Sequence, residues 1–388
     1  MQLAVLLLGL LLPPIVVEPN DGAPAVPGPT LRERLANRGL EPSLSLVVDT
    51  SLPFSGGVDD RLTTRSLLTA GIAIDLATGL GWKGTTFYVE GYSQAGRDAS
   101  VDVGDVQAFS NIDGPNVALL SELWLEHESD GGELRVKVGK MDANSEFAAV
   151  DAAGELIHSS AGYSPTIAFL PTYPDPAVGL TLAARPYDGW TAGVGLFNAD
   201  ENGVVSGRRG LSARFDELFV IAQVERAFDE DWNLGRGRVA IGGWHHTGDL
   251  ARFDGGVADH TDGAFVVVEH DLTRAEDAGR VDSTVFGQWG LADGDVAPVE
   301  GHFGIGLVSA IRFDEETWRT GLYVSHANLS DAAGSGLGGD ELAIEIYNEI
   351  PIAPGIVLAP DLQLIVDPSG RNDIGDAWVV TLRLIATL

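Results

Sequence analysis

The chain has 388 residues, no cysteine and a formal net charge of −32 at pH 7. The absence of cysteine excludes disulfide bonds, thiol catalysis and cysteine-based metal sites. The acidic excess argues against a nucleic acid partner, because phosphate binding requires a basic surface. Many acidic residues gather in loop-like clusters, which are typical of a solvated surface or, alternatively, of an acidic vestibule that attracts cations.

The N-terminal residues predict export. Residues 3–17 form an apolar run too short to span a bilayer, and Ala23-Pro24-Ala25 has the form of a cleavage site. We therefore expect a signal peptide over residues 1–25, although no basic residue precedes the apolar run. Residues 26–40 predict a spacer and a short amphipathic helix that ends at Gly39. No other apolar run is long enough to predict a transmembrane helix.

Residues 41–388 alternate between apolar and polar positions, as half-buried strands do. Each alternating segment is on the order of 10 residues, the length that crosses a tilted barrel wall. The predicted fold class is therefore all-β, a closed antiparallel transmembrane barrel of about 16 strands. The segments are 42–50, 65–77, 84–96, 117–127, 133–141, 177–185, 189–198, 218–227, 236–248, 263–273, 281–292, 302–313, 317–327, 340–350, 355–366 and 375–388.

The connections between these segments alternate in length, which is typical of an outer-membrane barrel and not of a β-sandwich or propeller. The short connections are 79–83, 129–132, 186–188, 228–235, 314–316 and 351–354. The long connections are 51–64, 97–116, 142–176, 199–217, 249–262 and 328–339. The third long loop, 142–176, contains apolar residues such as Phe147 and Leu156, so we expect it to fold inward, with a short helix within 148–162, and not to form an outer lid.

Six aromatic residues lie in or beside the short connections: Trp82, Tyr187, Trp190, Phe228, Trp232 and Trp318. Aromatic side chains are enriched at membrane interfaces, so this pattern predicts a girdle at one rim. The alternative is that these side chains pack one end of a protein core.

Alternation within the strands predicts which side chains face lipid and which face the interior. In the last segment Trp378, Val380, Leu382 and Leu384 share one face, and Thr381 and Arg383 share the other. In 117–127 we expect Leu119, Leu123 and Leu125 to face lipid and Glu122, Trp124 and Glu126 to face inward. In 133–141 Arg135 and Lys137 face inward, which predicts cross-strand pairs with the glutamates. The same parity places further side chains inward: Tyr88, Glu90, Arg238, Trp244, Glu345, Tyr347, Asp361, Gln363 and Arg383.

These inward side chains suit a sugar. Carboxylate, amide and guanidinium groups form hydrogen bonds with hydroxyl groups, and an indole ring can stack on the apolar face of a pyranose. Trp124 is the candidate platform, although it can equally fill space between the wall and the inward loop. The inward charges can also pair with one another and only solvate the wall.

Several separated sequence blocks carry a resemblance to a known family. They are residues 104–112, which include Asn111, and then Glu122-Leu123-Trp124-Leu125-Glu126, residues 138–147, residues 237–248, Glu345-Ile346-Tyr347-Asn348, residues 358–363 and Asp367-Pro368-Ser369-Gly370. In this order the blocks resemble the carbohydrate-selective porin (OprB) family. The resemblance implies a sixteen-stranded channel for monosaccharides in the bacterial outer membrane, surrounded by lipid and inserted by the barrel-assembly machinery, with a monomer and a homotrimer as the two candidate assemblies. Members usually end in an aromatic residue, whereas this chain ends in Leu388.

Enzyme and metal sites have weaker support in the sequence. His245 and His246 are adjacent in a strand and point to opposite faces, so they cannot easily share one metal ion with Asp249. Glu122 and Glu126 share a face like a glycosidase dyad, but neighbouring cations favour ion pairing.

We therefore predict a passive sugar channel without catalysis, metal or cofactor. The alternatives are a general cation-preferring porin and, in another class, an outer-membrane enzyme or a secreted β-rich sugar-binding protein.

Overall fold

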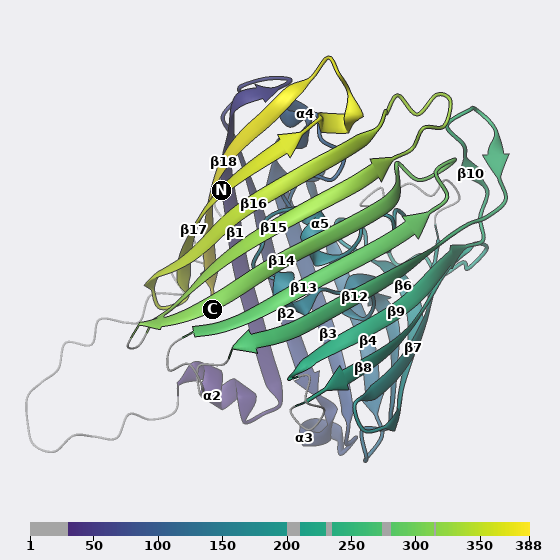
Figure 1. Cartoon of the computed structure of the whole chain (residues 1–388). Coiled ribbons are helices and arrows are strands. Elements are labelled where there is room, and N and C mark those ends of the chain that lie inside the picture. The colour runs from purple at the N-terminus through teal and green to yellow at the C-terminus, as the bar shows by residue number, and fades with distance from the viewer. Residues whose placement is uncertain (1–29, 200–209, 230–234, 274–280, 314–315) are drawn as a thin grey trace, which may run out of the picture.

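The computed structural model describes residues 30–199, 210–229, 235–273, 281–313 and 316–388. Within these residues, sixteen antiparallel strands form one barrel, which closes where β1 pairs with β18 (Figure 1). The barrel strands are β1 (Leu40–Gly57), β2 (Thr63–Asp75), β3 (Thr85–Gly96), β4 (Val117–Glu128), β5 (Leu134–Met141), β6 (Ala177–Tyr187), β7 (Trp190–Asn198), β8 (Leu218–Phe228), β9 (Gly237–His246), β12 (Thr261–Thr273), β13 (Val281–Ala292), β14 (Val299–Phe313), β15 (Glu316–Leu329), β16 (Asp340–Ala353), β17 (Ile356–Val366) and β18 (Gly375–Thr387).

Each predicted segment corresponds to one of these strands, so the predicted fold class is confirmed. The first connection differs from the prediction, because residues 51–57 extend β1 and leave only residues 58–62 between β1 and β2. The extension pairs with β18 through two register shifts, from Ser51 opposite Thr381 to Gly57 opposite Gly375. Such irregular pairing hides the period-two pattern from which strands are predicted.

The last strand shows why the wall has two chemically different faces. In β18 the odd-numbered residues from Ala377 to Arg383 are buried, and the even-numbered residues from Trp378 to Leu384 are exposed. Strand geometry directs alternate side chains to opposite faces, so the apolar set lies on the outside and Thr381 and Arg383 lie inside. This alternation agrees with the sequence prediction for the strand.

Short helical segments lie at the ends of the barrel and inside it. Helix α2 (Leu31–Ala36) begins with a capping box between Thr30 and Glu33, and it lies with α3 (Leu76–Leu80) at one end (Figure 1). At the other end lie α4 (Ser100–Val103) and the hairpin of β10 (Leu250–Ala251) and β11 (Val257–Ala258). Helix α5 (Ser159–Gly162) and the 3-10 turns Ala143–Ser145 and Asp151–Ala153 belong to the 142–176 loop. A further 3-10 turn, Pro368–Gly370, follows β17.

Among the described residues, no helix has the length and apolar character needed to span a membrane. The expected signal peptide, residues 1–25, lies outside the described residues.

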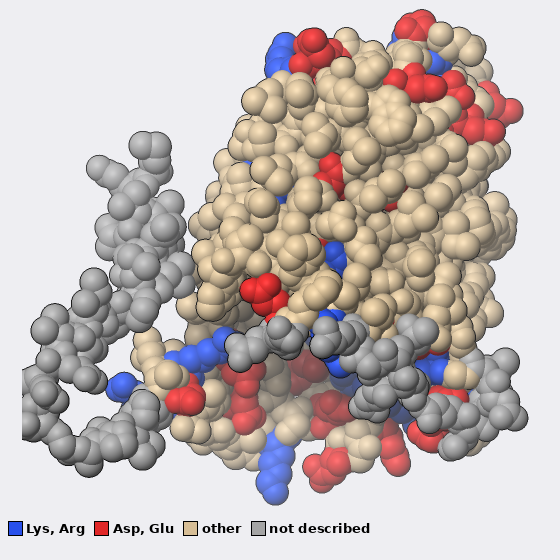
Figure 2. All heavy atoms as spheres, turned by 60° about the vertical axis from the view of Figure 1, so that its left-hand side comes forward, with Lys and Arg blue, Asp and Glu red and all other residues tan. Residues whose placement is uncertain are grey.

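Charge and aromatic residues divide the outer surface into bands. Charged side chains gather toward the two ends of the face shown in Figure 2, and most of the surface between them is uncharged. Trp82, Tyr187, Trp190 and Trp318 are exposed beside short connections at one rim, whereas Trp232 lies outside the described residues. This arrangement fits a barrel that meets lipid along its middle and water at its ends.

Candidate functional site

Two long connections occupy much of the barrel interior. Residues 97–116 join β3 to β4, and residues 142–176 join β5 to β6. Both connections contain completely buried side chains, such as Phe109 in the first and Ile157 in the second. Loop residues therefore fill part of the interior, and the inward loops decide which wall residues remain accessible.

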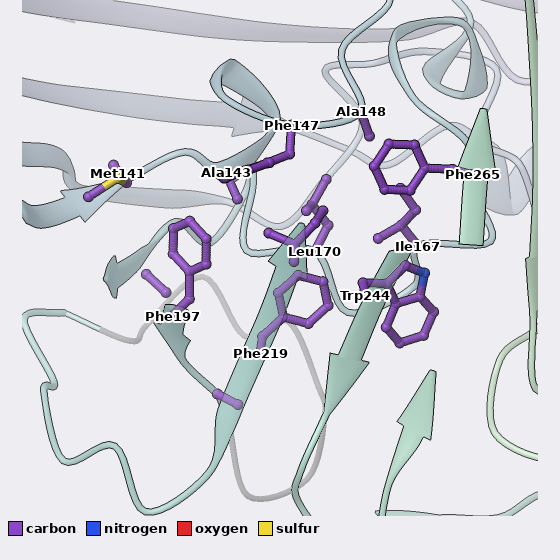
Figure 3. Close-up of a cluster of buried hydrophobic side chains, with 13 residues drawn as sticks. Met141, Ala143, Phe147, Ala148, Ile167, Leu170, Phe197, Phe219, Trp244 and Phe265 are labelled. Carbon is purple, nitrogen blue, oxygen red and sulfur yellow. The ribbon is translucent and has the colours of Figure 1, made fainter. Parts of the chain in front are cut away.

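The 142–176 loop is anchored by apolar packing against the inner wall (Figure 3). Phe147 from the loop lies in one buried cluster with Phe219 of β8 and Trp244 of β9. A glycine at position 195 permits this approach, because a Cβ atom there would lie 2.7 Å from the Phe147 ring. Leu156 and Ile157 join a second cluster farther along the loop. Burial of these side chains holds the loop inside the barrel.

Polar wall side chains bind the backbone of the same loop. Glu345 accepts hydrogen bonds from the amides of Ile157 (2.6 Å) and His158 (3.3 Å). Five more wall side chains make comparable bonds: Gln223 with Ala148, Arg238 with Ala149, Glu269 with Ala152, and Gln288 and Tyr323 with Ser160. These bonds supply partners for loop backbone groups inside the barrel, where unpaired groups are costly.

The 97–116 loop is held in part by the strands at the barrel closure. Arg383 of β18 donates two hydrogen bonds to Asp49 of β1 (2.7 and 2.8 Å) and one to Asn111 of the loop (2.7 Å). Arg65 of β2 forms an ion pair with Asp113 of the loop at 2.6 Å. Charge-assisted, bidentate contacts of this kind fix the positions of their partners strongly.

A cavity of about 400 Å³ remains beside β1–β4 and between the two loops. Its wall includes Glu90 and Tyr92 of β3, Glu122 of β4 and Arg383 of β18. The loops contribute polar groups as well, among them Asn111, Asp142, Glu155 and Tyr173. The cavity is thus bordered by hydrogen-bonding side chains on most of the elements that enclose it.

On the β3–β4 side, aromatic and acidic side chains orient one another. The hydroxyl of Tyr88 donates to Glu90 (2.7 Å), and the indole nitrogen of Trp124 donates to Glu122 (2.6 Å). The rings of Tyr88 and Trp124 lie 5.0 Å apart, and the ammonium of Lys137 lies 4.3 Å from the centre of the indole. The indole of Trp124 therefore packs against the ring of Tyr88 and forms a cation–π contact with Lys137.

The expected cross-strand ion pairs form between β4 and β5. Arg135 lies 3.0 Å and Lys137 lies 3.4 Å from Glu126. Glu146 from the 142–176 loop also pairs with both cations, at 2.5 Å from Arg135. The sequence did not indicate that Glu146 joins these ion pairs. Glu146 belongs to a loop, and the alternation of residues in strands does not predict the path of a loop.

The other residues that were predicted to face inward differ in whether they border the cavity. Glu90, Glu122 and Arg383 border the cavity. Five lie on the inner face of the wall but are covered: Trp244, Glu345, Tyr347, Asp361 and Gln363. Trp244 stacks on Phe219 at 5.7 Å, and Gln363 donates to the carbonyl of Phe109 in the 97–116 loop. Arg238 is also tied to a loop, with Glu225 as a partner at 2.7 Å.

One residue points opposite to the sequence prediction. The pairing of β3 with β4 shifts by one residue, so that Glu90 faces Glu122 but Tyr92 faces Leu119. Tyr92 reaches inward to the carbonyl of Pro174, and cross-strand partners share a face. Leu119 therefore faces inward, and the prediction that it faces lipid is wrong. A β-bulge adds one residue to a strand and reverses the parity beyond it.

Burial changes the titration of two groups in the 142–176 loop. Burial raises the pKa of Asp142, although hydrogen bonds from Thr172 and from the amides of Asn144 and Tyr173 oppose the shift. Burial lowers the pKa of His158 to about 3, so this imidazole is neutral at neutral pH. In the described ranges, no group of three or more His, Cys, Asp or Glu side chains has a geometry that could hold a metal ion.

Comparisons with solved structures support the fold. The high pH structure of Pseudomonas putida OprB superposes with a TM-score of 0.81 at 17% identity, covering 92% of this chain and 96% of that chain. The low pH structure of the same protein gives a TM-score of 0.60 at 15% identity, covering 92% and 94%. A loop L8 deletion mutant of OmpT from Vibrio cholerae gives 0.52 at 11% identity, covering 90% and 99%. At these identities the likeness concerns the fold alone.

Sequence comparison gives the family. Porin B of Pseudomonas aeruginosa is 28% identical over 125 residues, a stretch that spans 30% of this chain and 28% of Porin B. The sequence model of the family described as "Carbohydrate-selective porin, OprB family" matches residues 60–388. These residues include most of the barrel and both inward loops. The chain therefore belongs to the carbohydrate-selective porin, OprB family, and is a porin of the bacterial outer membrane.

Proposed function

We propose that small sugars, such as monosaccharides, diffuse passively through the cavity beside β1–β4. The observation that carries this proposal is the cavity of about 400 Å³, whose lining includes carboxylates, phenols, an amide and a guanidinium. Small-molecule pockets commonly enclose about 300–1,000 Å³. Polar groups of these kinds form hydrogen bonds with sugar hydroxyls in place of water. Family membership supports a carbohydrate as the solute.

Within this proposal, Glu90 and Glu122 accept hydrogen bonds from hydroxyl groups of the passing sugar. Both carboxylates border the cavity and are held in place by neutral donors on their own strands. Trp124 orients Glu122, and its contacts with Tyr88 and Lys137 favour a packing role over that of a stacking platform. Arg383 and Asn111 supply polar groups on the opposite side of the cavity.

The proposed transport needs no cofactor, energy source or catalytic step, because the solute moves down its own gradient. The expected partners are the surrounding outer-membrane lipid and the barrel-assembly machinery, with a homotrimer as a possible assembly. Two alternatives remain for experiment. One is a general cation-preferring porin, which the acidic cavity lining favours, and the other is an outer-membrane enzyme.

A liposome-swelling assay with sugars of increasing size tests the proposal. We expect rapid entry of monosaccharides and a steep decrease for disaccharides, because the loops leave only a small opening. An enzyme would give no swelling above that of protein-free liposomes. A general porin would pass sugars and linear polyols of equal size at equal rates, and that result would contradict carbohydrate selectivity.

A further inference from the structure

Two carboxylates on the β3–β4 side of the cavity have only neutral hydrogen-bond donors. Glu90 accepts from the hydroxyls of Tyr88 (2.7 Å) and Ser121 (2.8 Å). Glu122 accepts from the indole of Trp124 (2.6 Å). Glu90 and Glu122 are also direct cross-strand partners. Like charges in such positions destabilise a sheet, although the positive charge of Lys137 acts on Glu122 in the opposite direction.

A third carboxylate, Asp142, borders the same cavity. It accepts hydrogen bonds from the amides of Asn144 (2.8 Å) and Tyr173 (3.2 Å) and from the hydroxyl of Thr172 (2.9 Å), all of which are neutral. The negative charge of Glu90 acts on Asp142, and that of Asp142 acts on Glu122. The three carboxylates therefore share one electrostatic environment on one side of the cavity.

Three of the nearby cations, Lys137, Arg383 and Arg319, are bound to other carboxylates. Lys137 pairs with Glu126 and Glu146, and Arg383 pairs with Asp49. Arg319 lies 3.2 Å from both Glu155 and Glu349, the two remaining acids of the cavity wall. In the part of the chain that the structure describes, no Lys or Arg nitrogen forms an ion pair within 4.0 Å of Glu90, Glu122 or Asp142. These three carboxyl groups are therefore available to a solute.

We propose that Glu90, Glu122 and Asp142 give the channel a preference for sugars that carry a protonated amine over neutral sugars of the same size, and over acidic sugars. An ammonium group offers three donors and a full charge to carboxylates that otherwise repel one another. Acidic side chains in a narrow pore with low-dielectric walls concentrate cations and exclude anions. This inference rests on the proposed sugar channel and specifies the substrate class of its cavity.

The test uses proteoliposomes that contain the full chain and three labelled solutes at pH 7: glucosamine, glucose and glucuronate. At low salt we expect glucosamine to enter about threefold faster than glucose, and glucuronate to enter more slowly than glucose, as an acidic pore requires. In about 1 M salt the difference should shrink, because the Debye length falls to about 3 Å. Equal rates for glucosamine and glucose at low salt would overturn the inference.

Variants assign the preference to the cavity. Glu90→Gln and Glu122→Gln should each lower the ratio of glucosamine to glucose entry, and the double variant should bring it close to one. The matched control is Asp130→Asn, which removes an exposed carboxylate in the short connection between β4 and β5 and should leave the ratio unchanged. An unchanged ratio in the folded double variant would refute the inference. If neither glucose nor glucosamine enters faster than in protein-free liposomes, the proposed channel itself fails.

Discussion

The two sides of the inner wall carry similar polar side chains with different surroundings. On the covered side, β8–β17, residues such as Arg238, Gln288 and Glu345 bind the backbone of the 142–176 loop. On the open side, β3–β5, residues such as Glu90 and Glu122 bind neighbouring side chains and border the cavity. An inward direction therefore does not make a residue part of the solute pathway, because the position of the loops decides its role.

This difference has an energetic consequence. A buried polar group that loses its partner retains the full cost of its desolvation, whereas a group beside a water-filled cavity can exchange its partner for water. Substitutions on the covered side should therefore lower stability. Substitutions on the open side should mainly change which solutes pass.

The largest effect is expected where charge is most deeply buried. Arg383→Met leaves Asp49 without its bidentate partner, and the side chain of Asp49 is completely buried. Breaking a buried ion pair from one side costs about 3–5 kcal/mol, and we expect a loss at the lower end of this range because Arg65 still lies 3.6 Å from Asp49. The loss should appear as a lower urea midpoint for the gel shift between folded and unfolded barrel.

The matched control for this change is Arg371→Met, which breaks an exposed pair with Asp373. It should leave the urea midpoint unchanged, because exposed ion pairs contribute little to stability. A loss for Arg383→Met no greater than that of the control would show that the Asp49 pair does not anchor the barrel closure.

A smaller loss is expected from Glu345→Ala. The substitution leaves the buried amides of Ile157 and His158 without an acceptor, which costs about 2–3 kcal/mol. Because the 142–176 loop is then less firmly held, the single-channel conductance should rise or become noisy. Glu345→Gln retains one acceptor oxygen and should lose less. Wild-type stability and conductance in the alanine variant would contradict the anchoring role of the covered side.

The sequence predicted the strands and the face of most residues well, because both follow from a period of two that local residues express. The prediction failed where a β-bulge interrupts the period of two. The register shift between β3 and β4 is such a case, and it reverses the face on which Leu119 lies. Bulges leave little trace in a single sequence, since any residue type can occupy them. The extension of β1 to Gly57 was missed for the same reason.

The division between covered and open residues was not predictable from alternation. Glu345 and Glu122 have the same inward parity, but one meets a loop backbone and the other meets the cavity. That outcome depends on contacts between residues far apart in the chain, such as Phe147 with Trp244. Asp49 and Asn111 were missed because they gain their role only when the first and last strands pair.

A pH-dependent effect on stability is expected from the loop that the covered side binds. Burial lowers the pKa of His158 from 6.5 to about 3, so at pH 5 the unfolded chain binds a proton that the folded protein does not. The stability contributed by the neutral imidazole is present above pH 6.5 and falls by about 1.4 kcal/mol per pH unit as the pH drops toward about 4. His158→Asn keeps a capping acceptor but does not titrate.

The measurement is the difference in urea midpoint between wild type and His158→Asn across this pH range. As the pH falls, the urea midpoint of His158→Asn should rise relative to that of the wild type. The exposed His260 supplies the control, and His260→Asn should run parallel to wild type. Parallel curves for His158→Asn as well would show that His158 titrates as it does in the unfolded chain.

The smallest effect on stability is expected on the open side, from Glu126→Gln. Its partners Arg135 and Lys137 keep Glu146, and the pair is partly exposed, so the loss should be at most about 1 kcal/mol. The pore nevertheless loses one negative charge, which should shift the reversal potential in a salt gradient toward anions. Glu128→Gln, two residues along β4 at the exposed rim, should change neither quantity. A loss in Glu126→Gln as large as that in Glu345→Ala would mean that open-side ion pairs contribute as much stability as the bonds of the covered side, and the distinction between the two sides of the wall would not hold.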